Sequence, residues 1–315
     1  MIPKVLLADS NHEILHNTLR TAGIHCDLFW DKSVEELKSL LPEYDGLVIR
    51  SRFKLDKEIL TPLTKLKCIG RVGAGMENID VPFAESKGIK CLCVPEGNRD
   101  AVGEHALGML LMLLNRLKIA DAEVRQGIWL RAENRGTEIS GKTVGIIGFG
   151  HMGSAFAKKL SGFDCTILAH DKYKTGFSNA YVQEATLEQI YELSDIVSLH
   201  LPLTSETTYY ASSSFFNAFK KEIYFINTAR GKCVDTAALV EAIESKRVLG
   251  ACIDVLEYES VSFEALDARA LPAPMQYLLK AENVLLSPHI AGWTHESNYK
   301  MSKGIAEKMI QVLKP

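Results

Sequence analysis

The sequence lacks the features that mark membrane, secreted and nucleic-acid-binding proteins. Its longest apolar runs, such as residues 106–114, are too short to span a bilayer. No basic segment leads into an apolar one at the N-terminus, which argues against secretion and favours a cytoplasmic protein. The formal net charge is only −3, with 36 basic and 39 acidic residues, so neither nucleic acid nor a membrane surface is an expected partner.

Cysteine is sparse and shows no pairing pattern. The seven cysteines are an odd number scattered through apparent strands and helices, as expected for reduced thiols. Cys91 and Cys93 lie two apart, like alternate residues of a strand, and no second Cys/His pair has the spacing of zinc ligands. We therefore predict no metal site.

What the sequence does contain is a regular alternation of short apolar runs and amphipathic stretches, typical of parallel βαβ units. With 315 residues and 47% hydrophobic composition, two modest cores are expected. A long, nearly all-round apolar helix is predicted from Asp100 to about Lys118, buried at a domain or subunit interface. Helices are also expected over residues 11–22 and about 295–313. Strands are expected at residues 4–9, 46–50, 68–71, 90–94, 143–147, 166–168, 196–199, 223–226, 250–253 and 284–286.

A glycine-rich stretch predicts a site for an anionic dinucleotide. Gly148-Phe149-Gly150-His151-Met152-Gly153 follows an apolar run and opens an apparent helix over residues 154–160, the context that this fingerprint requires. Gly148 permits the tight turn, Gly150 lets the backbone approach the pyrophosphate, and Gly153 allows the helix to pack on the strand. The pyrophosphate would lie at the helix N-terminus, where unpaired N–H groups favour an anion. The alternative, a glycine turn that binds nothing, leaves this context unexplained.

An acidic residue follows at the position expected for recognition of NAD. Asp171 comes eighteen positions after Gly153, at the end of the next strand. A carboxylate there accepts hydrogen bonds from the ribose hydroxyls of NAD and repels a 2′-phosphate. Lys172 adjoins it and softens that repulsion, so the strictness of the NAD preference stays open.

Three later motifs supply the groups that 2-hydroxy acid chemistry needs. Arg230 lies in Asn227-Thr228-Ala229-Arg230-Gly231, Glu259 ends the stretch 254–259, and His289 lies in Ser287-Pro288-His289-Ile290-Ala291-Gly292. The guanidinium would bind a carboxylate and polarise the adjacent carbonyl, and the imidazole would exchange the proton. Glu259 would orient the ring and favour its protonated form. Singly these are ordinary turn and surface residues, but their order after a nucleotide motif indicates hydride transfer between 2-hydroxy and 2-keto acids.

This ordered set resembles the D-isomer-specific 2-hydroxyacid dehydrogenase family over essentially the whole chain. The resemblance implies two doubly wound parallel-sheet α/β domains, flavodoxin-like and Rossmann, with an interdomain cleft. The substrate domain would comprise residues 1–98 plus 290–315 and the NAD domain residues 99–289, through which a homodimer would form. Ser260 departs from the family, which often has Pro there, and the segment from Ser260 to Lys280 is longer than usual.

The family also implies the site residues. The catalytic residues would be Arg230, Glu259 and His289, with Asp254 facing the nicotinamide carboxamide. The cofactor-binding set would be Ala74, Gly148, Gly150, His151, Met152, Gly153, Asp171, His200, Leu201, Pro202, Thr228, Ala229, Asp254, Ala291 and Gly292.

The first half of the chain resembles phosphoglycerate dehydrogenases through three peptides, at residues 48–51, 70–80 and 127–131. The implied substrate-binding residues are Arg50, Ser51, Arg71, Gly73, Ala74, Gly75 and Arg131. Arg50 and Arg71 follow two parallel strands, at the sheet edge where ligands bind, and Arg131 matches a position that reaches the partner subunit's site. Three arginines suit a phosphate dianion. The alternative is that Arg131 and Arg50 pair with surface carboxylates.

Three functions are therefore compatible with the sequence. The first is NAD-dependent oxidation of D-3-phosphoglycerate to 3-phosphohydroxypyruvate, the entry to serine synthesis. The second is reduction of unphosphorylated glyoxylate or hydroxypyruvate. The third is an NAD(H)-sensing protein like the transcriptional corepressors on this scaffold. Because the chain ends after its last helix, feedback by serine through a C-terminal domain is not expected.

Overall fold

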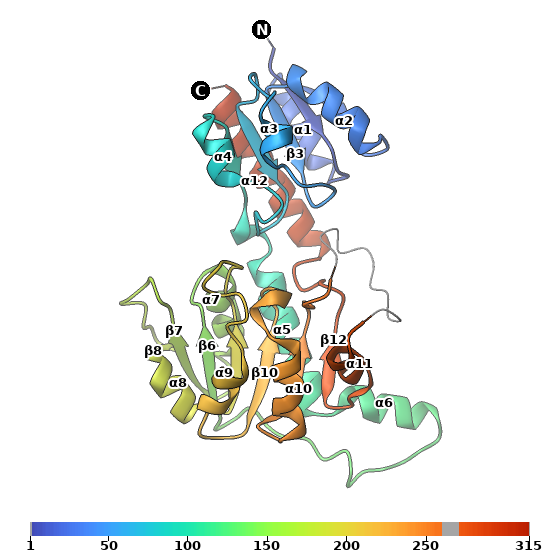
Figure 1. Cartoon of the computed structure of the whole chain (residues 1–315). Helices are drawn as coiled ribbons and strands as arrows, with labels where there is room; N and C mark the ends of the chain where they lie inside the picture. Colours follow the sequence, from blue (N-terminus) through green and yellow to red (C-terminus); the bar gives the residue numbers. More distant parts are fainter. Residues whose placement is uncertain (1, 260–270, 315) are drawn as a thin grey trace. The chain divides into compact units, whose positions relative to one another are not determined.

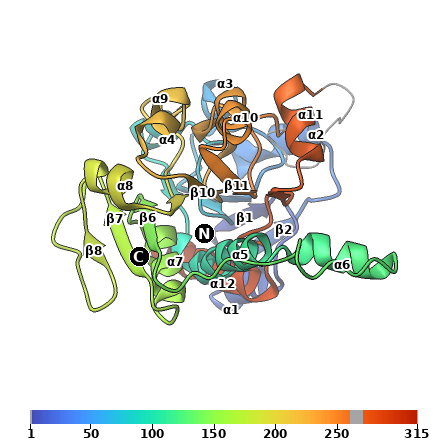
Figure 2. The same cartoon turned by 90° about the horizontal axis from the view of Figure 1, so that it is seen from below.

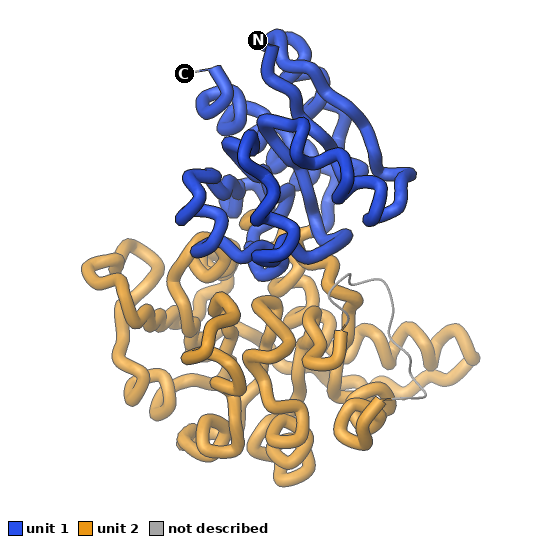
Figure 3. The backbone as a smooth tube through the Cα atoms, turned by 45° about the horizontal axis from the view of Figure 1, so that its top comes forward, with its two compact units in different colours: residues 1–98, 260–264, 293–315 blue, residues 99–259, 265–292 orange. Residues whose placement is uncertain are grey.

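The computed structural model describes residues 2–259 and 271–314, and these fall into two compact units. The chain passes from the first unit to the second after Asn98 and returns after Gly292, so the C-terminal helix belongs with the N-terminal residues (Figure 3). Ser260 and the rest of the long segment up to residue 270 lie outside the described residues. Among the described helices, none combines the length and apolarity needed to cross a membrane.

The first unit is built on a parallel sheet with strand order β2-β1-β3-β4-β5 among the described residues, the flavodoxin-like order. Its strands are β1 Lys4–Leu7, β2 His25–Leu28, β3 Gly46–Ile49, β4 Cys68–Arg71 and β5 Lys90–Leu92. Its helices are α1 Ile14–Thr21, α2 Val34–Leu40, α3 Lys57–Leu60, α4 Val81–Ser86 and α12 His295–Leu313, with short 3₁₀ turns at Leu41–Glu43 and Pro95–Gly97.

Each face of this sheet is covered by its own helices, which gives the unit two apolar layers. Helices α1 and α12 supply Leu15, Ile305 and Met309 to one layer, and α2 and α4 supply Leu37 and Ala84 to the other. Figure 1 shows α12 beside α1 although the two lie at opposite ends of the sequence.

The backbone of β4 tolerates no side chain where α12 crosses it. A Cβ added at Gly70 would lie 2.6 Å from Cγ2 of Ile305. This close approach seats the C-terminal helix on the N-terminal sheet.

The second unit holds a larger parallel sheet with order β12-β11-β10-β9-β6-β7-β8 among the described residues. Its strands are β6 Thr143–Ile147, β7 Thr166–His170, β8 Gln183–Glu184, β9 Ile196–Leu199, β10 Ile223–Asn227, β11 Val248–Ile253 and β12 Val284–Leu286. Its helices are α5 Arg99–Leu114, α6 Leu117–Arg125, α7 His151–Leu160, α8 Leu187–Leu193, α9 Ser213–Ala218, α10 Thr236–Glu244 and α11 Ala273–Lys280, with a 3₁₀ turn at Gly231–Cys233. This is the Rossmann strand order with β12 added at one edge, and the direction in which successive strands are added to the sheet reverses between β6 and β9.

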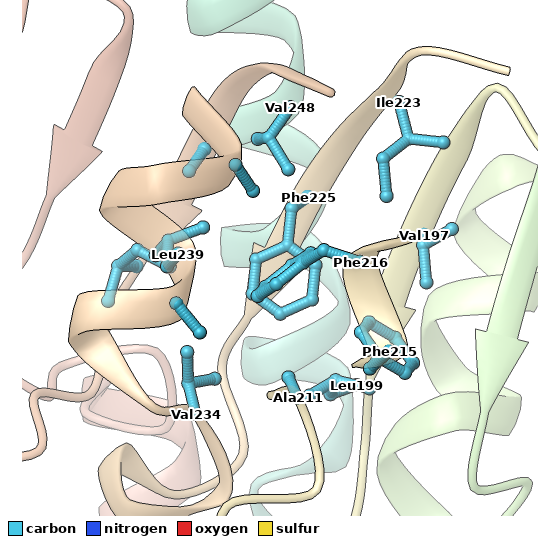
Figure 4. Close-up of a cluster of buried hydrophobic side chains, with 14 of the residues drawn as sticks. Val197, Leu199, Ala211, Phe215, Phe216, Ile223, Phe225, Val234, Leu239 and Val248 are labelled. Carbon is cyan, nitrogen blue, oxygen red and sulfur yellow. The ribbon is translucent and has the colours of Figure 1, made fainter. Parts of the chain in front are cut away.

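Alternate residues of the central strands point into two separate cores. Phe225 of β10 packs with Phe215, Phe216 and Leu239 from α9 and α10, as Figure 4 shows. The next residue, Ile226, faces the opposite layer formed with α5 and α7. Figure 2 shows α5 and α7 on one face of this sheet and α9 and α10 on the other. The prediction of two parallel-sheet α/β domains is confirmed.

One predicted helix differs from the structure. The apolar stretch predicted to continue to Lys118 ends at Leu114, and a separate helix, α6, begins at Leu117. Arg116 between them has φ +53°, the left-handed conformation, which cannot continue a right-handed helix. Within the single chain Met112 of α5 is 42% exposed, so burial of this helix at a subunit interface stays a prediction.

Candidate active site

The glycine-rich turn has the geometry that a dinucleotide pyrophosphate needs. Gly148 follows β6 with φ +93°, and a Cβ there would lie 2.5 Å from the carbonyl oxygen of His200. A Cβ on Gly153 would lie 2.1 Å from the carbonyl oxygen of Gly148, so α7 packs directly on the turn. A Cβ on Gly150 would meet no atom of the described part of the chain within 4 Å. Among the described residues, no side chain caps the first amides of α7, those of His151, Met152 and Gly153, which fits an anion at this terminus.

Asp171 is tied to that turn by its own carboxylate. Oδ2 accepts the amide of Phe149 at 2.8 Å, and Oδ1 accepts those of Tyr173 and Lys174 at 2.9 and 3.1 Å. Oδ2 accepts only this one printed hydrogen bond and so has a further lone pair that suits a ribose hydroxyl. Nζ of Lys172 donates to Glu206 Oε2 at 2.6 Å. This ion pair occupies the Lys172 ammonium, which would otherwise attract the 2′-phosphate of NADP.

Two buried polar atoms at the ends of β9 and β10 mark where a polar ligand would fit. His200 is 9% exposed, and its Nε2 lies 2.9 Å from the Ser198 hydroxyl. Burial lowers the pKa of His200 to about 3, so the ring is neutral. Among the described residues, neither Nδ1 of His200 nor the hydroxyl of Thr228 has a hydrogen-bond partner. The neighbouring Leu201, Pro202 and Ala229 line the same strand ends.

A tight turn after β10 presents Arg230. The side-chain amide of Asn227 holds the turn at both ends, accepting the amide of Ala229 and donating to the carbonyl of Arg230, each at 3.0 Å. Nη1 of Arg230 donates to the carbonyl of Ala229 at 2.7 Å. A Cβ on Gly231 would lie 2.0 Å from the carbonyl oxygen of Leu256. The backbone beside Arg230 therefore packs directly against the loop that leads to Glu259.

Glu259 and His289 contact each other although they are 30 residues apart. Nδ1 of His289 lies 3.1 and 3.2 Å from the two carboxylate oxygens of Glu259. The two side chains are 19% and 24% exposed, respectively, so water screens the pair only in part. A ring that donates from Nδ1 to a carboxylate has its tautomer and orientation fixed, and Nε2 becomes the nitrogen that exchanges a proton with substrate.

Asp254 anchors the turn that carries His289. Its carboxylate is 1% exposed and accepts the Ser287 hydroxyl at 2.6 Å and the amides of Ile290 and Ala291, both at 2.9 Å. Burial alone would raise the pKa of Asp254, but these hydrogen bonds and one with His105 lower it below its ordinary value. The amide of His289 donates to the Asp254 carbonyl at 2.7 Å, which helps hold His289 at φ +56°.

The structure thus reveals supporting residues that the sequence reasoning missed. Ser287 lay inside a quoted motif without a role, and His105 is the one imidazole within the apolar stretch of α5. Its Nε2 lies 3.0 Å from the Ser287 hydroxyl and 3.5 Å from Asp254. A single histidine at the start of the apolar run of α5 could have indicated this role.

The first unit brings together the arginines predicted to bind substrate at the ends of two neighbouring strands. Ile49 of β3 pairs with Arg71 of β4, so Arg50, directly after β3, lies at the same edge. Nε of Arg71 donates to the carbonyl of Arg50 at 3.2 Å, and a Cβ on Gly73 would lie 1.6 Å from Nη1 of Arg71. The Arg71 guanidinium therefore covers the backbone of Gly73. Ser51, Ala74 and Gly75 lie half-buried in the turns that follow these strands.

Arg131 does not belong to this group. It lies in the second unit, in an exposed segment after α6. Its predicted role in a partner's site stays a prediction.

Comparison with known proteins places the chain in a family. Residues 107–291 match the NAD binding domain of D-isomer specific 2-hydroxyacid dehydrogenases. The chain belongs to this family. NAD is thereby confirmed as the cofactor, and the prediction of an oxidoreductase is confirmed at the level of the family.

Relatives in this family differ in the substrate that their names give. The chain is 34% identical to D-3-phosphoglycerate dehydrogenase of Archaeoglobus fulgidus over 99% of its own length and 57% of that protein. It is 37% identical to glyoxylate reductase of Thermofilum pendens over 92% of its length and 85% of that protein. D-lactate dehydrogenase of Aquifex aeolicus, solved with NAD and lactic acid, matches with TM-score 0.83 at 27% identity over 99% of this chain and 94% of the other. The chain thus spans little more than half of the phosphoglycerate dehydrogenase it resembles.

Proposed function

We propose that this protein oxidises D-3-phosphoglycerate to 3-phosphohydroxypyruvate with NAD, the reaction that opens serine synthesis. The observation that carries the proposal is the state of Arg50 at the end of β3. Among the described residues its guanidinium makes no hydrogen bond and no ion pair within 4.0 Å. The Asp9 carboxylate, which accepts the Arg50 amide, attracts the guanidinium electrostatically, and the ring of Trp293 lies against its face. Arg50 is half-buried, its side-chain N–H donors make no hydrogen bond among the described residues, and Arg71 lies on the neighbouring strand. This arrangement suits a phosphate dianion.

The reacting groups have separate roles in this proposal. The first unit binds substrate and the second binds NAD, which accepts the hydride from C2 when bound. Arg230 binds the substrate carboxylate. Nε2 of His289 takes the proton of the C2 hydroxyl, and the resulting imidazolium is stabilised by the carboxylate of Glu259. In the reverse direction the imidazolium returns the proton to the carbonyl oxygen.

The cofactor contacts complete the proposal. The amides of His151, Met152 and Gly153 receive the pyrophosphate, and Asp171 receives the ribose hydroxyls. His200, Thr228, Ala229, Ala291 and Gly292 lie at strand ends or in turns of the same sheet. Asp254, which the family pattern assigns to the nicotinamide carboxamide, acts here first by holding the His289 turn.

A second candidate function is the reduction of unphosphorylated glyoxylate or hydroxypyruvate. The similarity to the Thermofilum glyoxylate reductase, at 37% identity over most of both chains, favours it. The same Arg230, Glu259 and His289 would serve, and Arg50 and Arg71 would then have no phosphate to bind.

Kinetics with both substrate types separate the two functions. The protein is assayed with 3-phosphoglycerate and NAD, and with phosphohydroxypyruvate, hydroxypyruvate and glyoxylate and NADH. Arg71→Ala should lower kcat/KM for the phosphorylated acids by about 10²-fold or more and for glyoxylate by no more than about threefold. Lys54→Ala removes an exposed cation of the same unit and serves as the control. Equal losses on both substrate types would refute the phosphate assignment.

We also propose a homodimer formed through α5, α6 and the segment that follows. Exposed apolar side chains gather in this stretch: Met112, Leu117, Val124, Ile128, Trp129 and Leu130. Exposed apolar groups close together in sequence and structure indicate an interface. Sedimentation should show a dimer that Val124→Asp weakens, whereas Leu193→Asp, at an exposed leucine of α8, should leave it intact.

The dimer proposal places Arg131 in the partner's site, which mixing two inactive variants tests. In a heterodimer of Arg131→Ala and His289→Ala subunits, one site would carry both wild-type residues. Mixed and refolded subunits should then recover about a quarter of wild-type activity, because half of the dimers are mixed and each has one intact site of two. No recovery would show that Arg131 acts within its own subunit or in neither.

A further inference from the structure

The guanidinium of Arg50 lies on the face of an indole. Its Cζ is 4.0 Å from the centroid of the Trp293 ring, and both residues belong to the first unit. Trp293 is 65% exposed, a large apolar surface to leave in water. The contact joins the end of β3 to the residues just before α12, which are 243 positions further along the chain.

The backbone of Arg50 is fixed independently of this contact. Its amide donates to Asp9 Oδ2 at 2.5 Å, and its carbonyl accepts Nε of Arg71 at 3.2 Å and Nδ2 of Asn78 at 3.1 Å. The long side chain is therefore the part of Arg50 left to be positioned. The indole restricts it by covering one face of the planar guanidinium.

Stacking and ligand binding use different parts of a guanidinium. The ring contacts the flat face, while the N–H donors point outward in the plane. A carboxylate partner would consume those donors, whereas an aromatic partner leaves them all available. Trp293 thus holds Arg50 in place without competing for the anion.

We propose that Trp293 is a positioning residue that pre-orients Arg50 for the phosphate of the substrate and thereby sets the preference for phosphorylated over unphosphorylated acids. The inference rests on the proposed function, since it assigns the phosphate to Arg50. Pre-orientation raises affinity because the side-chain entropy is lost before the ligand arrives.

Removal of the indole should act on the phosphorylated substrate alone. Trp293→Ala should raise KM for 3-phosphoglycerate by about two- to thirtyfold, the span of measured cation–π contributions, with kcat changed less than about twofold. KM for hydroxypyruvate should stay within about twofold. Trp293→Phe, which keeps an aromatic face, should recover most of the loss. Trp30→Ala, at a half-exposed tryptophan of the same unit, is the matched control.

Two further measurements show whether the effect runs through Arg50. In an Arg50→Ala background, Trp293→Ala should cause no additional rise in KM. Without any substrate, an arginine-selective dicarbonyl reagent should modify Arg50 faster in Trp293→Ala than in Trp293→Phe, as followed by peptide mass. Equal KM changes for both acids, an additive effect in the Arg50→Ala background, or unchanged reagent rates would each overturn the inference.

Failure of the proposed function gives a different pattern. If Arg50→Ala alone leaves KM for 3-phosphoglycerate unchanged, the phosphate does not bind at Arg50. The reagent would still modify Arg50 faster in Trp293→Ala. This result would show that Trp293 orients Arg50 but that the assignment of the phosphate to Arg50 is wrong. The proposed role of Trp293 in substrate preference would then be wrong as well.

Discussion

The carboxylate of Glu259 meets Nδ1 of His289 with both oxygens, at 3.1 and 3.2 Å. Because Glu259 contacts Nδ1 and leaves Nε2 to exchange the proton in the proposed function, it acts on the reaction through the ring. It orients the imidazole and offsets the positive charge that forms when Nε2 takes a proton.

Glu259→Gln tests whether the charge of Glu259 supports the imidazole of His289 during turnover. The carboxamide keeps the size of the side chain but removes its charge, so kcat should fall by about ten- to a hundredfold while KM changes little. His289→Ala, which removes the proton acceptor itself, should reduce kcat further while NADH still binds, as fluorescence titration would report. A Glu259→Gln enzyme with wild-type kcat would mean that the contact does not serve catalysis.

Asp254 should matter for both folding and turnover. Asn in its place cannot accept from Ser287, Ile290 and Ala291 with charge-assisted bonds, so Asp254→Asn should cost about 1–3 kcal/mol of unfolding free energy. Because these bonds fix the turn at His289, kcat should fall as well. Urea titration and steady-state kinetics measure the two effects, and Asp121→Asn, at an exposed aspartate of α6, is the control. A large loss of turnover with unchanged stability would indicate that Asp254 contacts the cofactor instead.

These contacts mark the limit of what the sequence could predict. Gly148, Gly150 and Gly153 were interpretable because their roles follow from local spacing around one turn. The order of Arg230, Glu259 and His289 was likewise informative because β10, β11 and β12 are adjacent parallel strands whose carboxyl ends meet. The stacking of Trp293 on Arg50 was not predictable, since it depends on how α12 returns to the first sheet.

The break in the predicted apolar helix was likewise not predictable from the local sequence. Residues on both sides of Arg116 have helical composition, and neither a proline nor a glycine marks the left-handed backbone at this position. Arg116 Nε reaches Asn134 of the loop that follows α6 at 3.4 Å. Local propensity carries no information about such a partner.

The acid sensitivity of the second unit should depend on His200. Unfolded histidine takes a proton below about pH 6.5. Burial lowers the pKa of folded His200 to about 3, so the folded ring does not take a proton at that pH. The unfolded state therefore binds more protons between these values, and stability is lost as pH falls from 6.5, by at most about 1.4 kcal/mol per pH unit.

A substitution at His200 should remove that slope. The unfolding free energies of wild type and His200→Gln are measured by urea titration at pH 7 and pH 5. Between these pH values wild type should lose stability relative to the variant. His295→Gln, at an exposed histidine, should track wild type at both pH values. Parallel curves for His200→Gln and wild type would show that the folded ring accepts a proton.

Two glycines of one turn should respond differently to the same added methyl group. A Cβ at Gly153 would lie 2.1 Å from the Gly148 carbonyl oxygen, so Gly153→Ala must push α7 from the turn and should lower the thermal midpoint by several degrees. Gly150→Ala has open space, so its midpoint should stay within about 2 °C of wild type. That open space is where the pyrophosphate would approach, and Gly150→Ala should still weaken NADH binding about tenfold or more. Thermal unfolding without cofactor and NADH fluorescence titration separate the two effects, and wild-type NADH affinity in Gly150→Ala would place the pyrophosphate elsewhere.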